Sequence, residues 1–175
     1  MTFQRYRELR ESAAARYKPE QVKLLLVAEA PPDSLERYFY FPEVSVHDPL
    51  FRYVAKELLG IGATRWNKPD LLARLQERGV FLIDLCLDPV PDKRTLRKRT
   101  LGACVPDLID RISALTPEHV ILIKVTVYDA AYVRLQSAAL PVVNERIPFP
   151  STGQQRRFEE AFRRALAAMR YSDQS

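Results

Sequence analysis

Residues 22–41 read VKLLLVAEAPPDSLERYFYF, and this stretch decides the fold class. Residues 24–27 are all apolar with no polar alternation, which is typical of a parallel strand buried on both faces. Pro31 and Pro32 end the strand, because proline lacks the backbone N–H that a sheet needs. Glu29 is therefore expected at the carboxyl end of a central strand, where open α/β sheets place their binding sites.

Strand and helix patterns alternate along the rest of the chain. Buried strands are expected at residues 22–28, 80–85, 119–123 and 141–147. Apolar periodicity and capping signals place helices at residues 3–16, 50–59, 69–78 and 103–115, from about 128 onward, and at 154–170. This order predicts an α/β fold: a three-layer α/β/α sandwich with a central, mainly parallel four-stranded sheet.

The length of 175 residues fits a single domain, with an N-terminal helix within residues 1–20 and a core over 21–170. No apolar stretch approaches the roughly 20 residues of a membrane helix, and the charged N-terminus lacks the apolar centre of a secretory signal. The simplest expectation is a cytoplasmic monomer that does not associate with membranes.

Cofactor signatures are absent from the sequence. Cys86 and Cys104 are too few for a disulfide scaffold or a four-thiolate cluster, and with only His47 and His119 besides, a zinc site is not expected. The chain has five glycines and neither of the glycine-rich motifs that bind dinucleotides or nucleoside triphosphates. No cofactor is therefore predicted.

Polar residues stand at the carboxyl ends of three expected strands. Glu29 follows the first, Asp84 interrupts the apolar run of the second, and Lys124 ends the third. The loop at residues 148–153 leads into the last helix, whose N-terminal amides are suited to a phosphate. Structural alternatives stay open: Glu29 and Asp84 as acceptors of backbone hydrogen bonds, and Lys124 as the ion-pair partner of either carboxylate.

These motifs together resemble the uracil-DNA glycosylase superfamily. Its first motif, Gly-Glu-Ala-Pro-Gly in one branch, corresponds to residues 28–32, Ala-Glu-Ala-Pro-Pro. Its strand with a base-reading Asn corresponds to residues 81–85, and its His-Pro-Ser motif corresponds to residues 149–151. The order of elements covers about residues 20–170.

The resemblance implies binding to DNA and to a base rotated out of the duplex. Glu29 would then align the water that attacks the anomeric carbon. The residues implied to contact the base are Asp84, Phe39, Phe41 and Phe149. The residues implied to hold the phosphate backbone are Ser151, Thr152 and Gly153.

Two departures from the family pattern predict little excision of uracil. Phe149 replaces the histidine that hydrogen-bonds the base, and losing such a donor typically costs on the order of 100-fold to 1000-fold in rate. Asp84 replaces the asparagine, and a carboxylate only accepts hydrogen bonds. It suits an exocyclic amino group better than the O4 acceptor of uracil.

Basic residues form two clusters that suit a polyanion, although a solvated basic face is the plain alternative. The residues singled out for DNA contact are Lys93, Arg94, Arg97, Lys98 and Arg156. Two functions are weighed: a DNA N-glycosylase-like hydrolase acting on a base other than uracil, and a nucleic-acid or nucleotide-binding module that lost the chemistry. A small-molecule hydrolase using Glu29 and Asp84 is a third.

Overall fold

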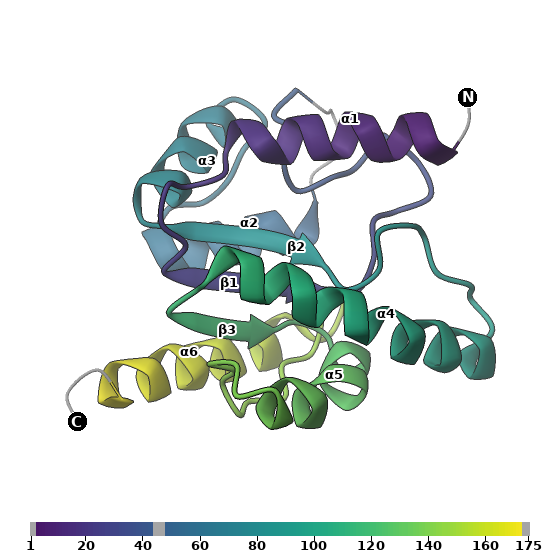
Figure 1. Cartoon of the computed structure of the whole chain (residues 1–175). Helices are drawn as coiled ribbons and strands as arrows, with labels where there is room; N and C mark the ends of the chain where they lie inside the picture. Colours follow the sequence, from purple (N-terminus) through teal and green to yellow (C-terminus); the bar gives the residue numbers. More distant parts are fainter. Residues whose placement is uncertain (1–2, 44–47, 173–175) are drawn as a thin grey trace.

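The computed structural model describes residues 3–43 and 48–172 of the chain. Within them the chain forms six helices and one open sheet of three parallel strands in the order β2-β1-β3 (Figure 1). The strands are β1 (Leu24–Ala28), β2 (Val80–Asp84) and β3 (His119–Leu122). The helices are α1 (Phe3–Arg16), α2 (Pro49–Leu59), α3 (Lys68–Glu77), α4 (Arg94–Leu115), α5 (Val125–Ser137) and α6 (Gln155–Ser172).

The central position of β1 explains its uninterrupted apolar sequence. In the parallel register Leu24 lies opposite Val80 of β2 on one side and opposite His119 of β3 on the other. All five residues of β1 are buried. The buried parallel strand predicted from residues 24–27 is therefore confirmed.

The fourth strand expected at residues 141–147 does not form as a strand. Two isolated parallel bridges, Val120 with Val142 and Ile123 with Ile147, hold this segment beside the outer edge of β3. A continuous ladder is impossible between them, because Ile147 lies five positions after Val142 whereas Ile123 lies three positions after Val120. Between the bridges the N–H of Glu145 donates to the carbonyl of Val143 at 3.0 Å, within the segment itself. The sheet of the described residues thus has three strands instead of the expected four.

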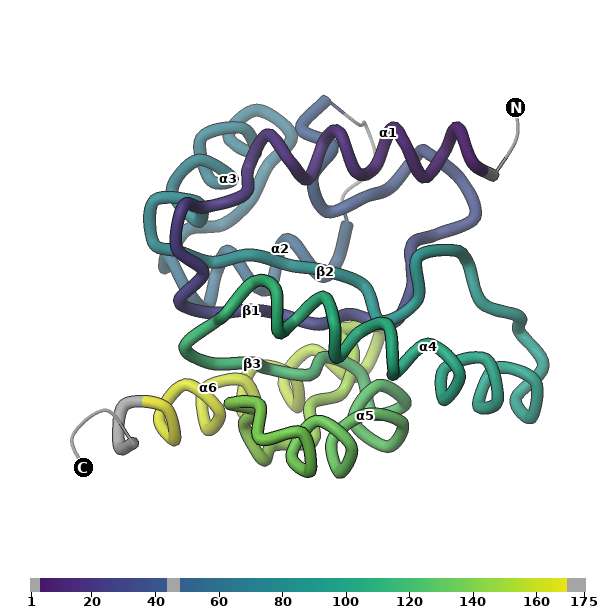
Figure 2. The backbone as a smooth tube through the Cα atoms, in the orientation of Figure 1, coloured from purple at the N-terminus to yellow at the C-terminus, as the bar shows by residue number. Residues whose placement is uncertain are grey.

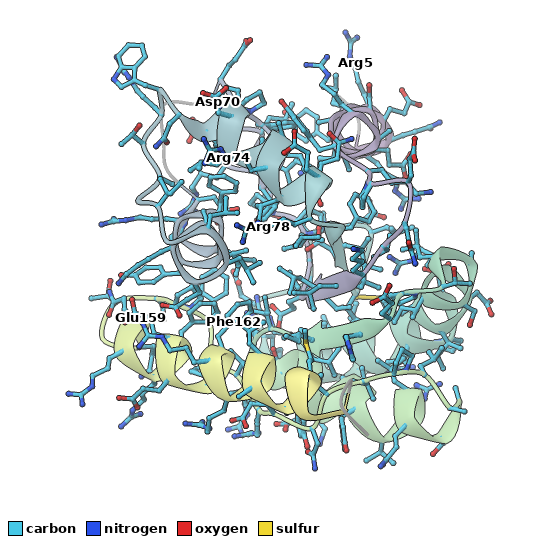
Figure 3. All side chains as sticks on the ribbon, turned by 90° about the vertical axis from the view of Figure 1, so that its left-hand side faces the viewer. Arg5, Asp70, Arg74, Arg78, Glu159 and Phe162 are labelled. Atoms are coloured by element: carbon cyan, nitrogen blue, oxygen red, sulfur yellow. A yellow bond between two sulfur atoms is a disulfide. The ribbon has the colours of Figure 1, made fainter. Side chains whose placement is uncertain are left out.

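Helices lie on both sides of the sheet. α4 crosses one face, and α2 and α6 lie on the opposite face (Figure 1; Figure 3). Phe162 points from α6 into the interior (Figure 3), and both Phe162 and Phe158 are fully buried. The buried residues of α4 are Leu101, Val105, Leu108 and Ile112. Apolar burial against the sheet is therefore what fixes these two helices.

Helix α4 begins at Arg94, well before the start at residue 103 that the sequence suggests. The basic run at residues 93–99 forms its first turns, which extend past the carboxyl ends of the strands (Figure 2). Most of these residues are exposed, so no apolar stripe marks them as helical. Arginine, lysine and leucine nevertheless favour helix intrinsically.

The segment after β2 is tied to α4 by a covalent bond. Cys86 and Cys104 form a disulfide across 18 residues of sequence, a pairing that the sequence left open. The backbone N–H of Cys86 also donates to the carbonyl of Glu29 at 3.0 Å. The disulfide therefore holds α4 close to the end of β1.

The remaining elements begin or end within a few residues of their expected bounds. Asp48 caps α2, accepting a hydrogen bond from the N–H of Leu50 at 2.9 Å, and Gly60 ends this helix with a φ of +70°. α5 begins at Val125 instead of near residue 128. Across the described residues, no helix combines the length and apolarity needed to cross a membrane.

Candidate functional site

The carboxyl end of β1 places Glu29 in a buried cluster of polar side chains. Glu29 is 8% exposed. Its Oε1 lies 2.5 Å from Nζ of Lys124 and 3.3 Å from Nη1 of Arg97. Its Oε2 accepts a hydrogen bond from the hydroxyl of Thr126. Two cations and one hydroxyl therefore hold the carboxylate in a fixed orientation.

Lys124 reaches Glu29 from a strained backbone position between β3 and α5. Its φ of +84° and ψ of +133° lie outside the regions that a side chain with a Cβ normally adopts. The N–H of Lys124 donates to the carbonyl of Ile147 at 3.0 Å, and its own carbonyl accepts from Val127 at 3.0 Å. Strain of this kind costs about 1–3 kcal/mol and persists at sites where the surroundings impose it. In this conformation the ammonium group of Lys124 contacts Glu29 at the end of β1.

Asp84, at the end of β2, stands apart from this cluster. Among the described residues none donates a hydrogen bond to its carboxyl oxygens, although its backbone carbonyl accepts one from Nη1 of Arg111 at 2.8 Å. Burial raises the pKa of Asp84 to about 7, and the nearby Asp48 and Glu29 carboxylates act in the same direction. Arg10 and Arg111 oppose the rise in pKa. Asp84 is thus a carboxyl group that changes protonation near neutral pH.

A pocket of about 250 Å³ opens where these strand ends meet; we call it the strand-end pocket. Its walls include Glu29, Phe39, Asp84, Lys124 and Phe149, so the structure brings together most of the side chains singled out for the base and the chemistry. The other residues that line it are Ala28, Ala30, Pro31, Pro32, Arg37, Tyr38, Asp48, Pro49, Leu50 and Leu82. The volume lies below the roughly 300–1,000 Å³ of pockets for drug-sized ligands, which points to a smaller occupant.

The aromatic cluster at residues 38–41 divides between the core and this pocket. Phe39 is buried, with its ring edge-on to Phe51 at 5.2 Å between centroids, and it also lines the pocket. Phe41 is not among the lining residues; its ring packs against Tyr38 at 5.0 Å. Tyr38 takes the place in the pocket wall that the sequence interpretation gave to Phe41.

The loop after residue 149 does not reach the strand-end pocket. Ser151, Thr152 and Gly153 are exposed and are absent from its walls. The N–H of Ser151 donates to the carbonyl of Phe149 at 2.8 Å, which forms a tight turn before α6. Any contact of these residues with a phosphate would therefore be made at the exposed surface, outside the walls of the pocket.

The basic residues of α4 have two different environments. Arg97 is half-buried, because it pairs with Glu29 and also contacts Asp92 at 3.3 Å. Lys93, Arg94 and Lys98 are exposed and form no ion pair with any described residue. Arg156, on α6, is exposed and pairs with Glu160 one turn along the helix. Arg99 of the run at residues 93–99 is likewise exposed and forms no ion pair with any described residue, so these four cations are the ones of the run that are available to a polyanion.

The sequence did not indicate the roles that three residues have in this site. Arg97 approaches Glu29 only because α4 begins nine residues earlier than expected, at Arg94 in place of 103. Thr126 lies in the first turn of α5, where only the position of that helix reveals its contact with Glu29. Asp48, the cap of α2, also lines the pocket, and burial raises its pKa.

No three His, Cys, Asp or Glu side chains of the described residues stand close enough together to hold a metal ion. His47 lies outside the part of the chain that the structure describes. Neither a protein-family model nor a curated protein sequence matches this chain.

Proposed function

We propose that this protein binds DNA and receives a base, rotated out of the duplex, in the strand-end pocket. One observation carries the proposal: a single small pocket is lined by two carboxyl groups, those of Glu29 and Asp84. The rings of Phe39 and Phe149 line the same pocket. Pockets that accept rotated bases combine stacking surfaces with polar groups that read the base edge. The exposed cations on the first turns of α4 support the DNA-binding part.

Asp84 is the group proposed to read the base. When ionised it accepts hydrogen bonds only, and when protonated it both donates and accepts. With a pKa of about 7 it is present in both forms near neutral pH. The ionised form suits a base that carries an exocyclic amino group, and the apolar ring of Phe149 offers no competing hydrogen bond. We therefore favour an amino-bearing base over uracil as the occupant.

The reaction proposed for this site is hydrolysis of the N-glycosidic bond. Water adds to the anomeric carbon, the bond from that carbon to the base nitrogen breaks, and the base leaves with the bonding electrons and a proton. Glu29 is proposed to orient the water through the lone pairs that Lys124, Arg97 and Thr126 leave open. Asp84 in its protonated form is placed to hydrogen-bond the departing base.

A second candidate is a binding module that reads a base without cleaving it. The observation that favours this alternative is the engagement of both carboxylate oxygens of Glu29 by neighbouring side chains. A carboxylate held in this way is less free to accept a proton from water. The three-layer, uracil-DNA glycosylase-like architecture is part of both proposals, with residues 141–147 in the place of a fourth strand.

A cytoplasmic location and a monomeric state also belong to the proposal. Disulfides in the cytosol are mostly transient, because thiol-reducing systems act on them. In that compartment Cys86 and Cys104 are expected to alternate between thiols and the disulfide.

The deciding experiment is an excision and binding panel. Oligonucleotides carrying different damaged or deaminated bases are incubated with wild-type protein, Glu29→Gln and Asp84→Asn, and the released bases and the affinities are both measured. Asp70→Asn is the matched control, because Asp70 is exposed on α3, away from the strand-end pocket (Figure 3).

Each outcome separates the two candidates. Release of one base by the wild type and its loss in Glu29→Gln supports the hydrolase. Binding that weakens only in Asp84→Asn, with no base released, supports the module. Failure of the wild type to bind any oligonucleotide contradicts both.

A further inference from the structure

A second pocket, of about 290 Å³, lies between α1 and β2; we call it the α1–β2 pocket. It shares Pro31, Tyr38, Leu82 and Asp84 with the strand-end pocket but is lined mainly by α1 and by residues 81–84 of β2. Four cations line it, Arg7, Arg10, Lys18 and Arg111, against the carboxyl groups of Glu11 and Asp84. The excess of positive charge favours an anionic occupant.

Arg10 is the unusual member of this set. It is 4% exposed, and its Nη2 donates to the carbonyl of Pro32 at 2.6 Å. Its Nε is buried and has no hydrogen-bond partner among the described residues. Nor does any described carboxylate form an ion pair with this guanidinium. A buried charge without a paired anion is costly, so this arginine has an unfilled demand for one.

The other two arginines of the pocket are already neutralised. Arg7 makes a two-point contact with Asp88, and Nε of Arg111 donates to Asp107 at 2.7 Å. Arg111 is further fixed by hydrogen bonds to the carbonyls of Asp84 and Leu85, both at 2.8 Å. Lys18 also forms no ion pair among the described residues, but it is exposed to solvent, so Arg10 is the buried cation of this pocket without a paired anion.

Apart from the hydroxyl of Tyr38, the rest of the wall is apolar. Its other residues are Ala14, Ala15, Pro31, Phe81, Leu82, Ile83 and Leu87. An inorganic ion alone would leave this surface in contact with water. An anion attached to an apolar body would satisfy both the guanidinium and the wall.

We propose that the α1–β2 pocket is a second binding site that takes a small organic anion, with its carboxylate or phosphate group on Arg10 and its apolar body against Phe81, Ile83 and Leu87. The proposal does not rest on the proposed DNA function, because its anchor is Arg10 and it uses neither Glu29 nor the basic turns of α4, although Asp84 lies in the walls of both pockets. The pair of hydrogen bonds that a guanidinium makes with a carboxylate or phosphate gives the geometry of recognition.

The test measures the binding of benzoate, phenyl phosphate and benzyl alcohol by calorimetry. The three probes share a ring, and only the first two carry a charge. At least one anion is expected to bind the wild type ten-fold or more tighter than the alcohol, and the tighter of the two identifies the preferred anionic group. Arg10→Met is expected to weaken that binding about 10- to 100-fold, the loss typical of one charged hydrogen-bond partner.

Arg5→Met is the matched control, because Arg5 lies on the same helix, is exposed and points away from the protein (Figure 3). Its affinity for the anions should equal that of the wild type. Equal affinity in Arg10→Met, or no saturable binding of either anion, would overturn the proposal.

A measurement on the wild type decides the matter even if the Arg10 variant fails to fold. The Nε–H resonance of Arg10 in a nitrogen-15 NMR spectrum should shift as the anion saturates. An anion that binds without moving this resonance occupies another place, and the α1–β2 site is then rejected.

Discussion

Nζ of Lys124 lies 2.5 Å from Oε1 of Glu29, and this partly buried pair joins the end of β3 to the end of β1. Removing one partner of a fully buried pair typically costs about 3–5 kcal/mol, because the other charge is left uncompensated, and the cost is smaller here because the side chain of Lys124 is 29% exposed. The contact therefore stabilises the packing of two strand ends at the strand-end pocket and also orients the carboxylate of Glu29.

The first prediction is a strong energetic coupling between these two residues. Lys124→Met and Glu29→Gln should each lower the free energy of unfolding by about 2–4 kcal/mol, and the double variant should lose at least 1 kcal/mol less than their sum. Lysine and methionine both carry a Cβ and an unbranched side chain, so the cost of the positive φ at position 124 should be similar in the two proteins. Urea unfolding of the four proteins gives the coupling.

The exposed pair Arg146–Asp129 serves as the control cycle, since both side chains are more than half exposed. Its coupling should stay within roughly 0.2–1 kcal/mol. Strict additivity at Glu29 and Lys124 would show that the pair is not formed in solution.

The second prediction concerns the pH dependence that Asp84 gives to stability. Its pKa rises from 3.8 in the unfolded chain to about 7 in the folded protein, mainly through burial. Between these values the unfolded state has lost a proton that the folded state keeps, so ionisation favours unfolding and wild-type stability falls as pH rises. Above about pH 8 the effect is constant.

Asp84→Asn removes this contribution of Asp84 to the pH dependence of stability. The stability of the variant relative to the wild type should therefore increase from pH 4 to pH 7.5, by up to roughly 4 kcal/mol. Thermal or urea unfolding across this range measures it, with Asp70→Asn as an exposed control. A stability difference that does not change with pH would mean that Asp84 titrates normally.

The third prediction is that the exposed cations of α4 carry the DNA affinity. Replacing Lys93, Arg94 and Lys98 together by Gln should weaken binding and reduce the slope of log affinity against log salt by about 2–3, if each contacts one phosphate. Fluorescence anisotropy at several salt concentrations provides both numbers.

A triple variant with the same loss of charge is the control. Arg16, Lys23 and Arg74 are exposed. Lys23 immediately precedes β1 and so lies at the amino end of the strand, whereas the pocket lies at the carboxyl end. Their replacement by Gln should leave the salt slope nearly unchanged. An equal reduction in both triple variants would point to net charge alone.

The fourth prediction concerns the Cys86–Cys104 disulfide. It closes a loop of 18 residues, which corresponds to a stabilisation of about 3 kcal/mol from the restricted unfolded chain. Reduction should lower stability by this amount and should increase hydrogen exchange in the segment between the cysteines, which contains the basic turns. Cys104→Ser should show the same lower stability with and without reductant, and a reductant effect that persists in it would contradict the explanation.

Predictability from sequence differed between elements for physical reasons. The strand at residues 24–28 was recognisable because a central parallel strand must be apolar on both faces, and the rule that parallel strands end at one edge placed Glu29 and Asp84 together. The segment at 141–147 has a strand-like composition, but whether it pairs continuously with β3 depends on the spacing of the two bridges, which the sequence does not show.

The sequence was less informative wherever a contact depends on three-dimensional approach. The first turns of α4 bury no apolar side chains against the core, so the sequence shows no apolar periodicity there from which a helix could be predicted. Without that helix, Arg97 could not be linked to Glu29. The proximity of Cys86 and Cys104 likewise follows only from the path of α4. Phe39, expected at the base, is buried and lines the pocket, whereas the presence of Tyr38 in its wall in place of Phe41 could not be predicted from the sequence.

The hydroxyl of Tyr40 accepts a hydrogen bond from the N–H of Leu82 at 2.7 Å and donates one to the carbonyl of Leu82 at 3.3 Å. Both backbone groups face outward from β2, on the side where the sheet has no further strand. A tyrosine thus occupies the positions that a neighbouring chain would use to extend the sheet, while residues 142–147 bridge to the opposite edge. A strand added at the β2 edge would therefore have to displace Tyr40 from Leu82, and one added beside β3 would have to displace residues 142–147.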